Sequence, residues 1–111
     1  MITTHVLDVS TGKPAAQVRV SLSRVEGSTR KPIGAGLTDA DGRLKELVRR
    51  GSEPGAGVFE LQFETGPYFR ARGVEHFHPH IIVVVEITDP KQHYHVPLLV
   101  SPFGYTTYRG T

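Results

Sequence analysis

Short runs of β-forming residues, each ended by glycine, proline or aspartate after about 8–12 residues, constrain the fold of this chain most strongly. Within residues 17–25, for example, Val18, Val20 and Leu22 alternate with polar side chains, which is typical of a strand with one buried face. The pair Asp41-Gly42 is a strong signal for a turn between strands. About seven or eight such strands predict a β-sandwich or a small barrel.

The same pattern predicts where the individual elements lie. Strands are expected at residues 2–9, 17–25, 33–38, 58–64, 81–87, 93–100 and 105–109. The run at 81–87 is β-branched throughout apart from Glu86, so we expect it to be covered on both faces. Residues 44–50 fit either a helical turn or a short edge strand. A short helix is expected at residues 68–73.

Length and composition exclude several classes of protein. The 111 residues suffice for one compact domain, residues 1–111, and not for two. Cysteine is absent, which excludes thiol catalysis, thiolate metal sites and disulfides. The net charge is only +2 and its Lys and Arg residues are dispersed, which argues against nucleic-acid binding. Without a leader-like start or a run of about 18 apolar residues, we expect a cytoplasmic protein with no membrane contact.

The six histidines are the most unusual feature of the composition. His76, His78 and His80 alternate, so an extended backbone would place them on one face, where imidazoles could bind zinc or copper. A polar loop is the favoured interpretation, because these residues have no carboxylate partner at a fixed spacing. His93 and His95 form a second alternating pair. We therefore predict no metal and keep a metal-dependent hydrolase as an alternative.

The usual catalytic motifs are missing from the sequence: there is no nucleophile elbow, no phosphate-binding glycine loop and no zinc-protease helix. Histidine, arginine and hydroxyl groups remain. They suit general acid–base catalysis on water and the stabilisation of a carbonyl oxygen that gains negative charge. This indicates hydrolysis or tautomerisation of a small polar ring, although His5 alone in a strand and Arg43 after a turn are more often structural or solvated groups.

Four segments together resemble the transthyretin-like 5-hydroxyisourate hydrolases almost from end to end. They are TTHVLD at residues 3–8, GKPA at 12–15, TDADGR at 38–43 and HYHVPLLVSPFGYTTYRGT at 93–111. The final Tyr-Arg-Gly-Thr is the feature that separates these enzymes from transthyretin, the hormone carrier with the same fold. The family's last residue is commonly serine, and Thr111 keeps its hydroxyl group while adding a methyl group.

The resemblance implies an all-β, transthyretin-like (prealbumin-like) sandwich of two antiparallel four-stranded sheets with one short helix. It also implies a homotetramer, built as a dimer of dimers, with active sites at the dimer–dimer interface. The implied reaction is the hydrolysis of 5-hydroxyisourate to 2-oxo-4-hydroxy-4-carboxy-5-ureidoimidazoline in urate breakdown, without a cofactor.

By the same resemblance, His5, Arg43 and His95 are the expected catalytic residues. Arg43 is expected to anchor the substrate and stabilise the oxyanion, and either histidine could be the general base. The residues expected to bind the substrate are His5, Arg43, His95, Tyr108, Arg109, Gly110 and Thr111. Two non-enzymatic alternatives are a carrier of a flat aromatic molecule and a purely structural module.

Overall fold

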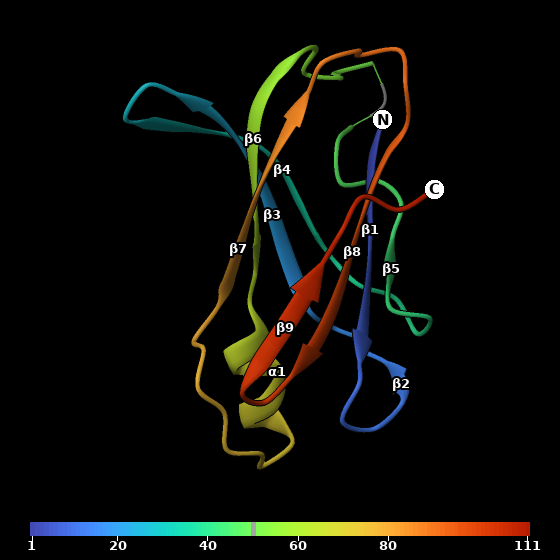
Figure 1. Ribbon diagram of the computed structural model, residues 1–111, viewed down its shortest axis with the longest axis vertical. Helices are drawn as coiled ribbons and strands as arrows, with labels where there is room; N and C mark the ends of the chain where they lie inside the picture. The colour runs from blue at the N-terminus through green and yellow to red at the C-terminus, as the bar shows by residue number, and fades with distance from the viewer. Residues whose placement is uncertain (50) are drawn as a thin grey trace.

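A computed structural model of the protein describes residues 1–49 and 51–111. Over these residues two β-sheets pack face to face, with one short helix at an end of the sandwich (Figure 1). The first sheet contains β1 (Ile2–Asp8), β2 (Lys13–Pro14), β5 (Arg43–Leu44), β8 (Tyr94–Ser101) and β9 (Gly104–Thr107). The second sheet contains β3 (Arg19–Glu26), β4 (Thr29–Leu37), β6 (Gly57–Phe63) and β7 (Ile81–Ile87). The predicted sandwich of two β-sheets with one short helix is confirmed.

The first sheet differs in two respects from the expected pair of antiparallel four-stranded sheets. Its order is β2-β1-β8-β9, β5 adds a fifth strand beside β1, and β1 pairs with β8 in parallel. Parallel pairing needs a long connection, and here the chain builds the whole second sheet between these two strands. In this register Thr3 lies opposite His95 and His5 lies opposite Pro97.

The core between the sheets follows from the period-2 pattern. Val20 and Leu22 of β3 are fully buried, as are the inward-facing residues of β6. On β1 the even-numbered residues point inward, which leaves Thr3 and His5 on the outer face of the first sheet. The same alternation places His95 of β8 outward.

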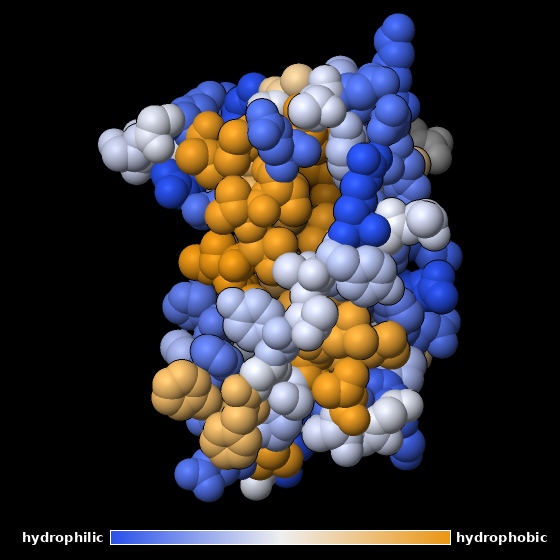
Figure 2. Space-filling view, viewed as in Figure 1, coloured by the Kyte–Doolittle hydropathy of each residue, from blue (hydrophilic) through white to orange (hydrophobic). Residues whose placement is uncertain are grey.

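The expectation that β7 is covered on both faces is wrong for the single chain. Ile81, Val83 and Ile87 are buried, whereas Ile82 is 41% exposed and Val84 is 59% exposed. The strand lies at the edge of its sheet, and its outer face has no layer packed on it in the described residues. Figure 2 shows apolar side chains gathered over this part of the surface.

The helix α1 spans Thr65–Ala71 and begins three residues before the expected position. The sequence shows Gly66-Pro67 there, which normally interrupts a helix. Proline is tolerated in a first helical turn, because its missing N–H would have no helical partner. Gly66 is needed because a Cβ would lie 2.4 Å from the Pro79 carbonyl oxygen. None of the described residues forms a helix with the length and apolar character that a membrane span requires.

Residues 44–50, expected as a helical turn or an edge strand, contribute only Leu44 to a strand, which pairs with β1. Residue 50 lies outside the described residues. The expected strand at 33–38 is longer in the structure, where β4 begins at Thr29.

Candidate active site

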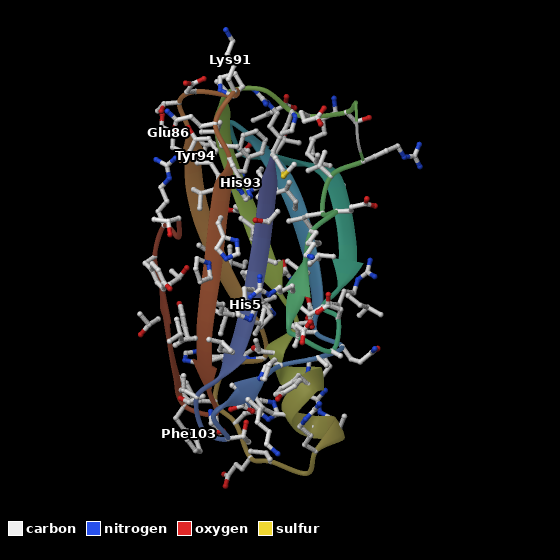
Figure 3. All side chains as sticks on the ribbon, turned by 90° about the vertical axis from the view of Figure 1, so that its right-hand side faces the viewer. His5, Glu86, Lys91, His93, Tyr94 and Phe103 are labelled. Atoms are coloured by element: carbon white, nitrogen blue, oxygen red, sulfur yellow. The ribbon has the colours of Figure 1, made fainter. Side chains whose placement is uncertain are left out.

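Three strands of the first sheet bring His5, Arg43 and His95 together. His5 on β1 lies opposite Arg43 on β5, and Thr3, two residues before His5, lies opposite His95 on β8. All of these side chains belong to the outer face of the sheet. Figure 3 shows this face, with His5 and His93 at different heights along it. Residues 38 to 90 positions apart in sequence are therefore brought onto one face through strand pairing.

The turn between β4 and β5 fixes both Arg43 and the ring of His5. Asp39 accepts hydrogen bonds from the backbone N–H groups of Asp41 (2.8 Å) and Arg43 (3.0 Å), and the Arg43 N–H is the main cause that lowers the pKa of Asp39. Gly42 has φ +75°, and a Cβ there would lie 2.4 Å from the Val6 carbonyl oxygen. Only glycine therefore fits this turn.

His5 is oriented by the same turn. Its Nε2 lies 3.0 Å from the backbone carbonyl oxygen of Asp41. A carbonyl oxygen can only accept, so Nε2 carries the hydrogen and the neutral ring has its lone pair at Nδ1.

His95 is held by a hydroxyl group. Its Nδ1 lies 2.8 Å from Oγ1 of Thr3, and the same Oγ1 lies 2.7 Å from Nε2 of His93. Burial is the main cause that lowers the pKa of His95, followed by the charges of His5, His93 and Arg43. The lowered pKa favours the neutral ring, which is the form that a general base requires.

Thr3 was not identified from the sequence as a site residue, and His93 was considered only as a metal ligand. The signal available was positional: Thr3 shares the outer face of β1 with His5, and His93 shares that of β8 with His95. Their contact depends on the parallel register, which the sequence does not reveal.

The C-terminal residues divide between two places. The Gly110 N–H donates to the His95 carbonyl oxygen (2.8 Å), and Thr111 lines the same cavity as Arg43 and His95. A Cβ on Gly110 would lie 2.6 Å from Cδ2 of His95, so the close approach requires glycine. Tyr108 and Arg109 instead line a second cavity, between β7 and the chain end.

Arg109 is anchored beside this second cavity, which His95 also lines. Its guanidinium donates to Oε1 of Gln92 (2.9 Å) and lies 4.4 Å from the ring centroid of Tyr94. Together with the Gly110 bridge to β8, these contacts tie the last residues to the sheet.

The cavity beside these residues has a volume of about 480 Å³, which is within the usual range for small-molecule sites. Its polar lining suits a small ring with several oxygens, since Arg43 can donate two parallel hydrogen bonds and the hydroxyls can donate or accept. The residues that line this cavity include Thr3, Arg43, His93, His95 and Thr111.

The histidines of the loop before β7 have separate surroundings. His76 stacks on Phe69 with ring centroids 5.9 Å apart, and His78 packs edge-on against Tyr105 at 5.4 Å. Within residues 1–49 and 51–111, no group of three or more His, Cys, Asp or Glu residues is arranged to hold a metal ion.

Comparison with known proteins gives consistent matches over the whole chain. Residues 2–110 match the HIUase/Transthyretin family. The 5-hydroxyisourate hydrolase of Mesorhizobium japonicum is 45% identical over 113 residues, covering 99% of this chain and 91% of the relative. The structure of Klebsiella pneumoniae 5-hydroxyisourate hydrolase has a TM-score of 0.86 and 38% identity, covering 99% and 98% of the two chains. Transthyretin from Sparus aurata has a TM-score of 0.89 and 33% identity, covering 98% and 95%.

Proposed function

The chain belongs to the HIUase/transthyretin family, and we propose that it hydrolyses 5-hydroxyisourate with two histidines and one arginine, without a metal. It is an enzyme of purine breakdown, and its product is 2-oxo-4-hydroxy-4-carboxy-5-ureidoimidazoline. The observation that carries the mechanism is that Arg43 and His95 line one cavity, while His5 lies opposite Arg43 on the neighbouring strand.

Arg43 binds the substrate and stabilises the transition state. The substrate is a flat bicyclic ring with several carbonyl oxygens, and a planar guanidinium matches such oxygens with paired hydrogen bonds. When water adds to a ring carbonyl, the oxygen gains negative charge, and a fixed positive charge beside it lowers the barrier.

His95 is the general base in this mechanism. Its Nδ1 is occupied by Thr3, so Nε2 takes the proton from water as the water oxygen attacks the ring carbonyl. The ring C–N bond then breaks, and His95 returns the proton from its Nε2 to the departing nitrogen. His5 is held in one orientation by its hydrogen bond to Asp41, and its Nδ1 can accept a hydrogen bond from the attacking water or the substrate.

The last four residues complete the site in different ways. Thr111 contacts the substrate or the attacking water, and Gly110 lets the chain pass close to His95. Tyr108 and Arg109 act by holding the chain end in place, with Arg109 fixed on Tyr94.

We propose a single domain over residues 1–111 that assembles as a homotetramer, a dimer of dimers with active sites at the dimer–dimer interface. A second copy over the outer face of the first sheet would close the open cavity. We propose a cytoplasmic enzyme without nucleic-acid or membrane partners. The small net charge and the dispersed Lys and Arg residues support the absence of nucleic-acid binding.

The test is the ultraviolet decay of freshly made 5-hydroxyisourate. The wild-type protein accelerates it, and His5→Ala, Arg43→Ala and His95→Ala each reduce the acceleration by about 100-fold or more. His80→Ala and Arg19→Ala, exposed residues away from the site, are matched controls and keep full activity. If the wild-type protein leaves the spontaneous rate unchanged, the enzyme proposal is wrong.

A metal requirement is tested in the same assay. Exhaustive chelation leaves the rate unchanged if the side chains alone carry the chemistry. A loss of activity that zinc restores would instead support a metal-dependent hydrolase.

A further inference from the structure

We propose that Thr3 is a positioning residue for this reaction, because its hydroxyl group joins His93 to His95 and determines which nitrogen of His95 carries a proton. The proposal rests on the proposed hydrolase function. It makes His93 the second hydrogen-bond partner of the Thr3 hydroxyl group, beside His95.

The geometry places one hydroxyl group between two imidazole rings. Oγ1 of Thr3 lies 2.7 Å from Nε2 of His93 and 2.8 Å from Nδ1 of His95, and both distances are those of good hydrogen bonds. The parallel pairing of β1 with β8 sets Thr3 opposite His95, so the strands hold all three groups. Thr3 is only 8% exposed, which limits access of water to its hydroxyl group.

Counting hydrogens shows that the two rings are coupled. A hydroxyl group has one hydrogen and two acceptor lone pairs, so Thr3 can donate to at most one ring, and when it does it accepts from the other. In the first arrangement His95 donates from Nδ1 to Thr3, and Thr3 donates to Nε2 of His93. In the second arrangement both bonds are reversed, and Nδ1 of His95 is the acceptor.

Of these two arrangements the first prepares His95 as a base, as does any arrangement in which Thr3 accepts from Nδ1 of His95. With hydrogen at Nδ1, the neutral ring has its lone pair at Nε2, the nitrogen left for water or substrate. In the second arrangement Nε2 carries the hydrogen and can only donate. Thr3 therefore selects the useful tautomer when it accepts from His95 and donates to His93.

His93 can also receive the positive charge formed during the reaction. After Nε2 of His95 takes a proton from water, the Nδ1 proton can move to Oγ1 of Thr3 while the Thr3 proton moves to Nε2 of His93. This transfer leaves His95 neutral and Thr3 unchanged, and it places the charge on His93. His93 is exposed and His95 is half-buried, so water solvates the charge better on His93.

The other charged groups around His95 favour its neutral form. His5 on β1 and Arg43 on β5 face it together with His93, so a positive charge on His95 meets positive or protonatable neighbours. The remaining charged groups on the cavity wall are Lys45, Glu46 and Glu53.

Adjacent threonines provide a matched pair of variants. Thr3→Val keeps the shape and strand preference of threonine but removes both hydrogen bonds, while Thr3→Ser restores the hydroxyl group. Thr4→Val is the control, because the buried hydroxyl of Thr4 donates to the Val96 carbonyl oxygen inside the core. His93→Phe removes the second partner at an exposed position, so it tests the same link without disturbing Thr3.

The experiment combines kinetics across pH with nitrogen NMR of ¹⁵N-histidine-labelled protein, which reads the tautomer of each ring. In the wild type, His95 is protonated at Nδ1 and bare at Nε2 at alkaline pH. Thr3→Val and His93→Phe convert this signal to a mixture of tautomers. Thr3→Val also lowers kcat by about tenfold or more with KM changed by less than about threefold, and it moves the acid limb of the pH profile.

The controls separate this role from a structural one. Thr3→Ser stays within about threefold of wild-type kcat, and Thr4→Val leaves the tautomer and the pH profile unchanged even if it lowers stability. If Thr3→Val and His93→Phe both leave the His95 tautomer unchanged, the proposal is wrong, whatever their kcat. If the wild type fails to accelerate 5-hydroxyisourate decay, the proposed function fails, and the NMR result still decides whether Thr3 sets the tautomer.

Discussion

At the scale of single residues, the backbone places strict limits on the catalytic rings. Gly110 lies against His95, and a Cβ there would lie 2.6 Å from Cδ2 of His95 and 3.1 Å from Cγ of Pro97. Gly110→Ala should therefore displace the ring or the chain end and lower kcat by about 10- to 100-fold, with little change in melting temperature. Gly104→Ala is the control, since its Cβ would meet only Ser101 Oγ at 3.9 Å. Equal activity of the two variants would contradict the close-packing explanation.

The lowered pKa of His95 predicts the pH dependence of both activity and stability. Burial and positive neighbours disfavour its charged form, so kcat/KM should rise from acid pH with an apparent pKa below about 6.5 and then level off. The unfolded chain binds this proton more readily, so the free energy of unfolding should be highest above about pH 6.5 and fall as the pH drops through the lowered value. Urea unfolding of wild type and His95→Gln at pH 5 and 7.5 measures this contribution. An acid limb centred above 6.5 would contradict the assignment.

At the scale of elements, the docking of α1 on β1 depends on one buried hydrogen bond. Tyr68 donates to Asp8 (2.9 Å), and burial followed by the Asp8 contact raises the pKa of Tyr68 to about 12, so the hydroxyl stays protonated in any assay. Tyr68→Phe should lower the free energy of unfolding by about 1–3 kcal/mol, measured in urea, because Asp8 loses a partner.

Thr65→Val is the control for this prediction. The Thr65 hydroxyl is buried and has no hydrogen-bond partner within the described part of the chain. Its removal should leave stability unchanged or slightly raise it. A Tyr68→Phe variant as stable as Thr65→Val would show that the hydrogen bond to Asp8 contributes little.

The same elements show how much of the fold could be predicted from sequence. The alternation in β3 and β6 and the turn at Asp41-Gly42 identify strands directly, because side-chain period and turn chemistry are local. The parallel pairing of β1 with β8 could not be found in this way, since a period of two is the same in parallel and antiparallel strands. The start of α1 was missed because its glycine is required by a distant contact with Pro79.

For the candidate site too, local features could be predicted from the sequence and long-range contacts could not. His5, Arg43 and His95 were found through a family resemblance, since their separation in sequence says nothing about their meeting in space. The turn that fixes Arg43 was visible in the sequence because its glycine and aspartates are adjacent. The link from Thr3 to His93 and His95 depends on strand register and so required the structure.

At the scale of the whole molecule, exposed apolar side chains support the proposed assembly. Phe77 is 71% exposed and Val84 is 59% exposed in the single chain, and exposed groups of this size are commonly buried between subunits. Light scattering should give four times the 12.2 kDa chain mass for the wild type, and Phe77→Ser or Val84→Glu should shift it to smaller species.

Val9→Glu is the matched surface control for the mass measurement. Val9 is 51% exposed and lies just beyond the end of β1, so its substitution should leave the mass unchanged. A tetramer that survives both Phe77→Ser and Val84→Glu would place the subunit contacts elsewhere.

Along both β1 and β8, side chains alternate between an inward face and an outward face, and the two faces have different roles. Most of their inward residues build the core, whereas Thr3, His5 and His95 lie on the outward face, so these three can be exchanged without rebuilding the core. A scaffold organised in this way can acquire a new chemistry through a few outward substitutions. Such substitutions would keep the fold while the sequence changes, and Sparus aurata transthyretin shares this architecture at 33% identity.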